Sequence, residues 1–130
     1  MKTNTNIKNI AANGVVKAGE FSYAKKPRTL KAYDREYELP VKTIEFSDKL
    51  VAANEAIVKT SNARETVEKI KSGIALFIGE EEAERIFPDK NFDSIDIDEI
   101  LGFWMALNFE LGRSQNDLIA RYSASRAIQI

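Results

Sequence analysis

The spacing of apolar and polar positions divides the chain into an irregular start, a short region of alternation and a helical remainder. Residues 1–28 show no helical stripe, although Val15–Val16 and Phe21–Tyr23 have the composition of short strands. Residues 29–46 alternate in part, which predicts a β-hairpin with its turn at Asp34–Arg35. We expect residues 1–28 to form a flexible arm ahead of the folded part of the chain.

Apolar residues recur at helical spacing from residue 47 onward. Ser47 is a typical N-cap for a first helix over residues 48–60, and Asn62 opens a capping box for a second helix over residues 63–78. The first helix has one broad apolar face, made of Leu50, Val51, Ala53, Ile57 and Val58. The second has apolar residues at steps of three and four, at Ala63, Val67, Ile70, Ile74 and Phe77. This second pattern predicts a seam that packs on another helix.

The next segments favour two or three more helices. Residues 80–87 suit a short helix that Pro88 ends, and residues 88–94 read as an irregular loop. Asp96 begins a capping box for a fourth helix over residues 97–111. A fifth helix could begin near residue 114. The pattern therefore predicts a mainly α fold, in which four to five helices pack as a small domain after a β-hairpin and the N-terminal arm.

The length supports one folded domain with terminal extensions. A chain of 130 residues is long enough to bury a real core but short for two domains. We divide it into the arm at 1–28, the hairpin and helices at 29–112, and a C-terminal helix or tail at 113–130. No run of 18 apolar residues occurs, and the first residues lack the apolar stretch of a signal peptide, so we expect a soluble intracellular protein.

The residue counts exclude several kinds of chemistry. The chain has no Cys and no His, which removes thiolate and imidazole metal sites, Cys nucleophiles and the commonest general base. We expect a protein that is not an enzyme, with no catalytic residues, no cofactor and no metal.

Two motifs resemble ligand sites and fail in detail. Gly14 and Gly19 have the spacing of a phosphate loop, but Glu20 follows where lysine is required. Asp89, Asn91 and Asp93 resemble the start of a calcium loop, without its glycine and its final glutamate. We interpret the second as a solvated loop, and the carboxylates of residues 81–84 as a solvated helix face.

Charge is distributed unevenly along the chain. Residues 1–36 carry eight Lys/Arg and three Asp/Glu, whereas residues 37–130 carry eleven and seventeen. A basic arm ahead of an acidic body suggests that the arm contacts an acidic surface. That surface could belong to nucleic acid, another protein, the body of the same chain or a neighbouring copy in a homo-oligomer. The arm lacks a dense Arg cluster and has few aromatic residues, so nucleic acid is the less favoured partner.

Residues 100–111 form the most informative segment because they are apolar almost all round the helix. Either this helix is the buried centre of the domain, or one side meets the core and another meets a partner. On the second interpretation we expect the partner contacts at Phe103, Trp104, Leu107 and Leu111. Gly73 and Gly102 lie inside helices, and close approach of the two helices would explain both.

Two stretches resemble a known family. Residues 35–57, a hairpin arm followed by a helix, and residues 65–110 are similar to the phage tail assembly chaperones of Gram-positive prophages. In the second stretch a helix runs into an apolar segment, a glycine with acidic residues, a turn and a last helix. The matching residues are Phe77, Ile78, Gly79, Glu80, Ala83, Ile86 and Phe87. The long arm and the segment after Gly112 depart from the family pattern.

The resemblance implies a non-enzymatic helper that binds the long helical tape-measure protein, or another phage tail protein, in the host bacterial cytoplasm. Such chaperones keep their client soluble until tail-tube subunits replace them. The alternative is a structural virion subunit, of the tail or the head–tail connector, that uses the N-terminal arm for subunit contacts. A small nucleic-acid-associated regulator is the third hypothesis.

Overall fold

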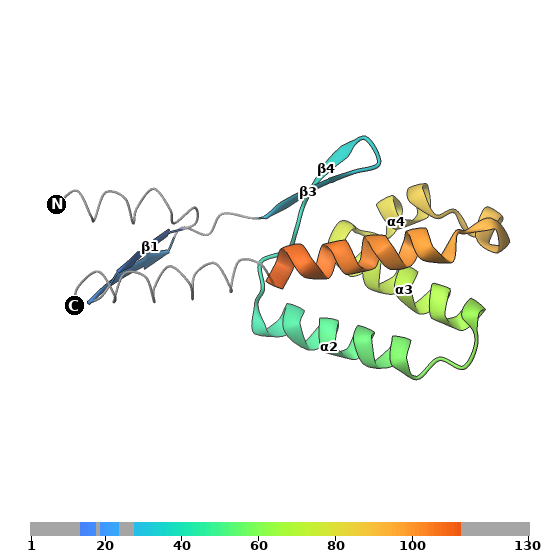
Figure 1. Cartoon of the computed structure of the whole chain (residues 1–130), viewed down its shortest axis with the longest axis horizontal. Coiled ribbons are helices and arrows are strands. Elements are labelled where there is room, and N and C mark those ends of the chain that lie inside the picture. Colours follow the sequence, from blue (N-terminus) through green and yellow to red (C-terminus); the bar gives the residue numbers. More distant parts are fainter. Residues whose placement is uncertain (1–13, 18, 24–27, 113–130) are drawn as a thin grey trace. The chain divides into compact units, whose positions relative to one another are not determined.

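The computed structural model describes residues 14–17, 19–23 and 28–112 (Figure 1). Residues Pro27–Glu110 form one compact unit, which we call the helical unit. It is mainly helical, with a two-stranded antiparallel hairpin ahead of the helices, and this confirms the predicted fold class. The predicted fifth helix lies outside the described residues, as does most of the predicted arm.

The strands form two separate hairpins. Outside the helical unit, β1 (Gly14–Lys17) pairs with β2 (Glu20–Tyr23) in antiparallel register. This pairing confirms the two short strands predicted within the first 28 residues. Within the helical unit, β3 (Thr29–Ala32) pairs with β4 (Arg35–Glu38), with Leu30 opposite Tyr37.

The turn of the second hairpin lies one residue earlier than predicted. Tyr33 and Asp34 connect the strands, with φ angles of 53° and 64°, and Arg35 already belongs to β4. Two consecutive positive φ angles are typical of the type I′ turn, which usually carries Asn and Gly. The sequence carries only a weak signal for this turn, because Tyr33 and Asp34 are not the usual pair. Tertiary contacts hold Tyr33 in the turn, among them an edge-on contact of its ring with that of Phe103, with centroids 5.2 Å apart.

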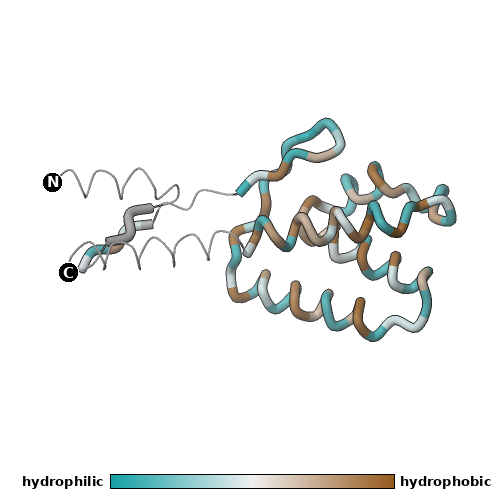
Figure 2. The backbone as a smooth tube through the Cα atoms, viewed as in Figure 1, coloured by the Kyte–Doolittle hydropathy of each residue, from teal (hydrophilic) through white to brown (hydrophobic). Residues whose placement is uncertain are grey.

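The first long helix, α2 (Ile44–Val58), begins four residues before the predicted start. Thr43 is its N-cap, since its hydroxyl accepts a hydrogen bond from the amide of Phe46 at 3.1 Å. None of its residues is buried, and apolar positions recur along it (Figure 2). Only part of the broad apolar face predicted for this helix packs on the unit, because Leu50 and Ile57 are half-buried whereas Val51 and Val58 are exposed.

The second long helix, α3 (Ala63–Ile78), matches its predicted bounds. Asn62 caps it by accepting a hydrogen bond from the amide of Glu65 at 2.9 Å, and Gly79 ends it with a φ of 92°. The predicted seam is confirmed apart from Ala63, which is exposed at the start of the helix. The buried residues of the helix are Val67, Ile70, Gly73, Ile74 and Phe77.

Two short segments and a long helix complete the unit. Helix α4 (Glu80–Ile86) is followed by a 3₁₀ segment, η1 (Asp89–Ser94), where an irregular loop was predicted. The last helix is described over residues 97–112 and begins where predicted. Asp96 caps it by accepting hydrogen bonds from the amides of Asp98 and Glu99.

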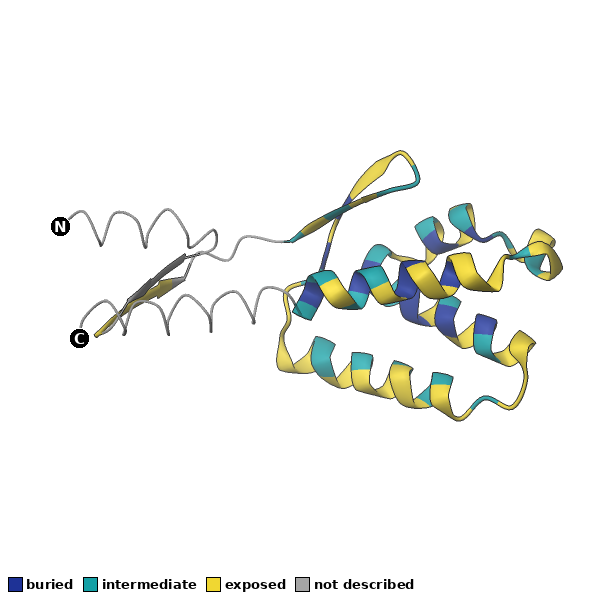
Figure 3. Cartoon of the chain, viewed as in Figure 1, coloured by how far each residue is buried: buried dark blue, intermediate teal, exposed yellow. Residues whose placement is uncertain are grey.

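The core lies between α3, α4, the hairpin and the last helix, as the dark blue positions in Figure 3 show. Four of its large side chains are almost completely buried, namely Ile70, Ile74, Ile100 and Leu107. The last helix shows buried and exposed positions along its whole length in Figure 3. Its burial therefore decides which of its apolar side chains can meet another molecule.

Candidate functional site

The four predicted partner contacts are buried side chains. Phe103, Trp104, Leu107 and Leu111 are 7%, 5%, 0% and 5% exposed. They present no surface to a partner in this conformation, so they act as core residues. The expectation of an interface at these positions is corrected by this burial.

A glycine on α3 fixes the orientation of the last helix. A Cβ atom on Gly73 would lie 2.6 Å from Cζ3 and 2.7 Å from Cη2 of Trp104. The indole therefore occupies the space that any other residue at position 73 would fill. Phe77 packs edge-on against the same indole, with ring centroids 5.8 Å apart. Close approach of the two helix backbones was predicted at Gly73, but the atoms that lie against this glycine belong to the Trp104 side chain. Gly73 therefore makes room for a buried indole.

The last helix also carries a row of large apolar residues that are exposed. We call this row the outer strip, and its members are Ile97, Leu101, Met105 and Phe109, which are 47%, 39%, 62% and 69% exposed. They recur every four residues, so the row winds by roughly a third of a turn around the helix over roughly 18 Å, at 1.5 Å per residue. Exposed apolar side chains that form a contiguous row are typical of a protein-binding surface.

Two small residues, Gly102 and Ala106, lie beside the outer strip. Together with Met105 and Phe109 of the strip, they stand at positions i, i+3, i+4 and i+7, which share one helix face. Gly102 is exposed, and no atom of the described residues lies within 4 Å of a Cβ built on it. The close approach between helices predicted at Gly102 is therefore absent inside the described part of the chain.

The surroundings of the outer strip are acidic. Residues 91–112 contain five Asp or Glu and no Lys or Arg. The whole helical unit has eleven basic and eighteen acidic residues, a net charge of −7. Asp98 lies on the same helix, one turn before Gly102. The chemistry available at this surface is thus apolar contact with an acidic border.

The hairpin is held to the helices by a polar network on another side of the unit. The hydroxyl of Tyr37 donates to Oε1 of Glu82 at 2.8 Å, and Arg35 donates to Oε2 of the same carboxylate at 2.6 Å. Arg85 donates to Glu82 and to the Tyr37 hydroxyl. The hydrogen bond from Tyr37, with those from Arg85, lowers the pKa of Glu82. Glu82 was predicted to be solvated, and it instead joins α4 to the hairpin.

A second bond ties the hairpin to the last helix. The hydroxyl of Tyr33 donates to Oε2 of Glu99 at 2.8 Å. Burial, followed by this hydrogen bond, raises the pKa of Tyr33, so its hydroxyl stays protonated. Tyr33 and Tyr37 are thus positioned as structural donors.

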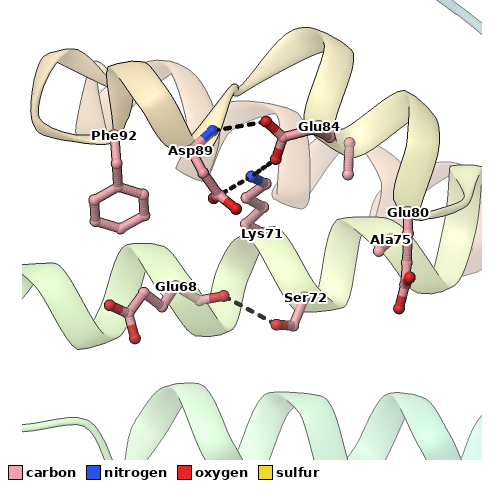
Figure 4. Close-up of a pocket in the computed structure, with 9 residues that line it drawn as sticks. Glu68, Lys71, Ser72, Ala75, Glu80, Glu84, Asp89 and Phe92 are labelled. Carbon is pink, nitrogen blue, oxygen red and sulfur yellow. Dashed lines mark hydrogen bonds and ion pairs between the residues drawn. The ribbon is translucent and has the colours of Figure 1, made fainter.

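A pocket of about 480 Å³ between α3, α4 and η1 is lined by a cluster of paired charged side chains (Figure 4). The ammonium of Lys71 donates to Glu84 and to Asp89, each at 2.6 Å. Burial alone would lower the pKa of Lys71, but these two hydrogen bonds outweigh it and raise the pKa. Lys71 is therefore charged and paired, which suits a link between elements and does not suit a nucleophile or a base.

The motifs that resembled ligand sites have structural roles. Gly14 begins strand β1, and Gly19 occupies the turn before β2 with a φ of 78°, so their spacing belongs to a hairpin. Asp89 pairs with Lys71 and Asp93 pairs with Arg64. Among the described residues, no group of three or more Asp or Glu side chains is arranged to hold a metal ion.

Comparison with family models, curated protein sequences and solved structures finds no match for this chain. In the part of the chain that the structure describes, no helix has the length and apolar character needed to cross a membrane. The outer strip is accordingly the candidate site on the strength of its own geometry. Sequence reasoning missed its residues because the helix is apolar around most of its circumference, and tertiary contacts such as that between Gly73 and Trp104 decide which residues face the core.

Proposed function

We propose that this protein is a non-enzymatic phage tail assembly chaperone that binds the tape-measure protein transiently through the outer strip. The observation that carries the proposal is the row of Leu101, Met105 and Phe109, which are large, apolar and exposed on the last helix. The resemblance of residues 30–110 to such chaperones supplies the identity of the client. The host bacterial cytoplasm, where tails assemble, is the proposed place of action.

The geometry suits reversible binding. A long helical client presents apolar stripes that would otherwise associate with each other, and an apolar helix face can cover such a stripe. The strip is narrow, so its burial must offset the loss of translational and rotational freedom with few side chains. Moderate affinity follows, and a chaperone that is later displaced by other subunits requires it.

Co-expression with the tape-measure protein of the same phage tests the proposal. We expect the full chain to raise the soluble fraction of that protein, and Phe109→Ser to abolish the effect. Val58→Ser is the matched control, because Val58 is 82% exposed on α2 and lies outside the strip. Unchanged solubility of the tape-measure protein with the wild-type chain would contradict the proposal, and so would equal losses in both variants.

The composition of purified virions separates this proposal from the structural alternative. A chaperone leaves before the tail is complete, so we expect mass spectrometry of purified particles to lack this chain. Its presence in stoichiometric amounts would favour a virion subunit and overturn the chaperone proposal.

A further inference from the structure

We infer that the outer strip binds an amphipathic α-helix that carries Lys or Arg beside its apolar residues, and that this helix crosses the last helix at Gly102. The inference rests on the proposed function and specifies which kind of client segment is recognised. It is carried by the exposed face of Gly102, Met105, Ala106 and Phe109 and by the charge around it.

The face has large and small side chains next to each other, against which a second helix can pack. Two large side chains, Met105 and Phe109, project from it at 62% and 69% exposure, beside Gly102 and the small Ala106. Side chains of a second helix fit between such ridges, and the absence of a Cβ at Gly102 lets the two backbones approach closely. An interior glycine costs helix stability relative to alanine. At Gly73 this cost is offset, because the missing Cβ makes room for the buried indole of Trp104. At Gly102 no side chain of the described residues occupies the corresponding space.

The charge around the face selects a basic partner. Residues 91–112 contain five acidic residues and no basic one, and the helical unit carries −7. Asp93 is paired with Arg64, whereas Asp98 lies on the last helix one turn before Gly102. A helix with Lys or Arg flanking its apolar stripe places positive charge over this border, as electrostatic complementarity requires. If this face met the same face of a second copy, the acidic residues beside the two faces would come together, so charge disfavours pairing of this face with itself.

Three labelled peptides test the inference on the full chain. The first is an 18-residue amphipathic helix of leucine and lysine, the second replaces each lysine by glutamate, and the third scrambles the first so that no apolar stripe remains. By fluorescence anisotropy at low salt we expect the first to bind about ten-fold more tightly than either of the others, with the advantage over the acidic peptide shrinking as salt rises. Equal affinity for the first and third peptides, or for the first and second, would overturn the inference.

Substitutions at Gly102 test the crossing point. Gly102→Ala should raise Tm by roughly 4 °C, because alanine favours the helix and the space is open. The same variant should weaken binding of the first peptide several-fold, and Gly102→Leu should weaken it further. Binding unaffected by both variants would refute a crossing at Gly102. Val58→Ser is the control that should leave binding unchanged.

The two proposals fail in distinguishable ways. If the peptide results hold but the tape-measure protein is no more soluble in co-expression, the face binds basic helices and the chaperone function is wrong. In the second case, Phe109→Ser abolishes solubilisation, but the three peptides bind with equal affinity and the Gly102 variants bind the first peptide as tightly as the wild-type chain does. The chaperone function then stands, and the inference about the bound helix is wrong.

Discussion

The two interior glycines of the long helices provide one substitution at two sites with different expected outcomes. Gly73 lies on α3 against Trp104, and Gly102 lies on the last helix with open space around it. At both sites alanine improves helix propensity by roughly 1 kcal/mol. The difference in unfolding free energy between Gly73→Ala and Gly102→Ala therefore isolates the contact with Trp104.

The magnitude follows from the distances. A methyl group at position 73 would lie 2.6 Å from the indole, and Trp104 is only 5% exposed and packed on Phe77. The ring must shift inside a close-packed core, and overpacking of this kind costs roughly 1–3 kcal/mol. We expect Gly102→Ala to be more stable than Gly73→Ala by that amount. Gly102→Ala should exceed the wild-type protein by about 1 kcal/mol.

Urea unfolding followed by circular dichroism measures this difference. The slope of unfolding free energy against urea should be the same in all variants, so that midpoints can be compared directly. The fluorescence of Trp104, the single tryptophan of the sequence, reports whether its surroundings change in Gly73→Ala. Variants of equal stability, within about 0.5 kcal/mol, would refute the packing argument.

A double-mutant cycle provides the control. Trp104→Phe replaces the indole by a smaller ring and removes the atoms that the new methyl group would meet. In that background Gly73→Ala should gain stability, as Gly102→Ala does in the wild-type protein. Additive effects of the two substitutions would show that Trp104 is not the group in the way.

Three further predictions follow from the polar network, the last helix and the turn. Glu82 has a lowered pKa in the folded protein, so its contribution to stability is present above the pKa of the unfolded chain and is lost as pH falls through the folded value. Thermal unfolding of Glu82→Gln should therefore depend less on pH in the acid range than that of the wild-type protein, and an identical pH profile would argue against the network. Leu107→Ala should cost about 2–5 kcal/mol because the side chain is fully buried, whereas Phe109→Ala should change stability by less than about 0.5 kcal/mol; similar losses would show that the outer strip is part of the core. Asp34→Gly should stabilise the protein by up to about 1 kcal/mol, because glycine accepts the φ of 64° without strain, and a lower Tm would contradict that assignment of the turn.

The sequence predicted the elements whose signals are local. Helix α3 has a capping box at Asn62, a glycine at its end and a regular seam, and its bounds came out as predicted. The start of α2 was misplaced because Thr43 and Ser47 are both suitable N-caps. The contact between Phe46 and Phe77, with ring centroids 5.4 Å apart, draws the earlier residues into the helix, and no local pattern encodes it.

The four residues predicted as partner contacts are buried, and the exposed apolar residues are others of the same helix. The last helix has apolar residues around most of its circumference, so its pattern left open whether the whole helix is buried or one side is exposed. It could not distinguish Trp104 and Leu107, which are buried, from Met105 and Phe109, which are exposed. The space at Gly73 that the indole of Trp104 fills is one contact that favours the observed rotation of the helix, and it lies about thirty residues away in the chain.

Helix α2 contains no buried residue, so we expect it to unfold locally before the rest of the unit. Elements with few buried apolar contacts open at lower free energy than the rest of a domain, while the others stay folded. The backbone amides of α2 should accordingly exchange hydrogen for deuterium sooner than those in the middle of α3, where Ile70 and Ile74 are almost fully enclosed. Within the helical unit, a protease should accordingly cut α2 before it cuts α3.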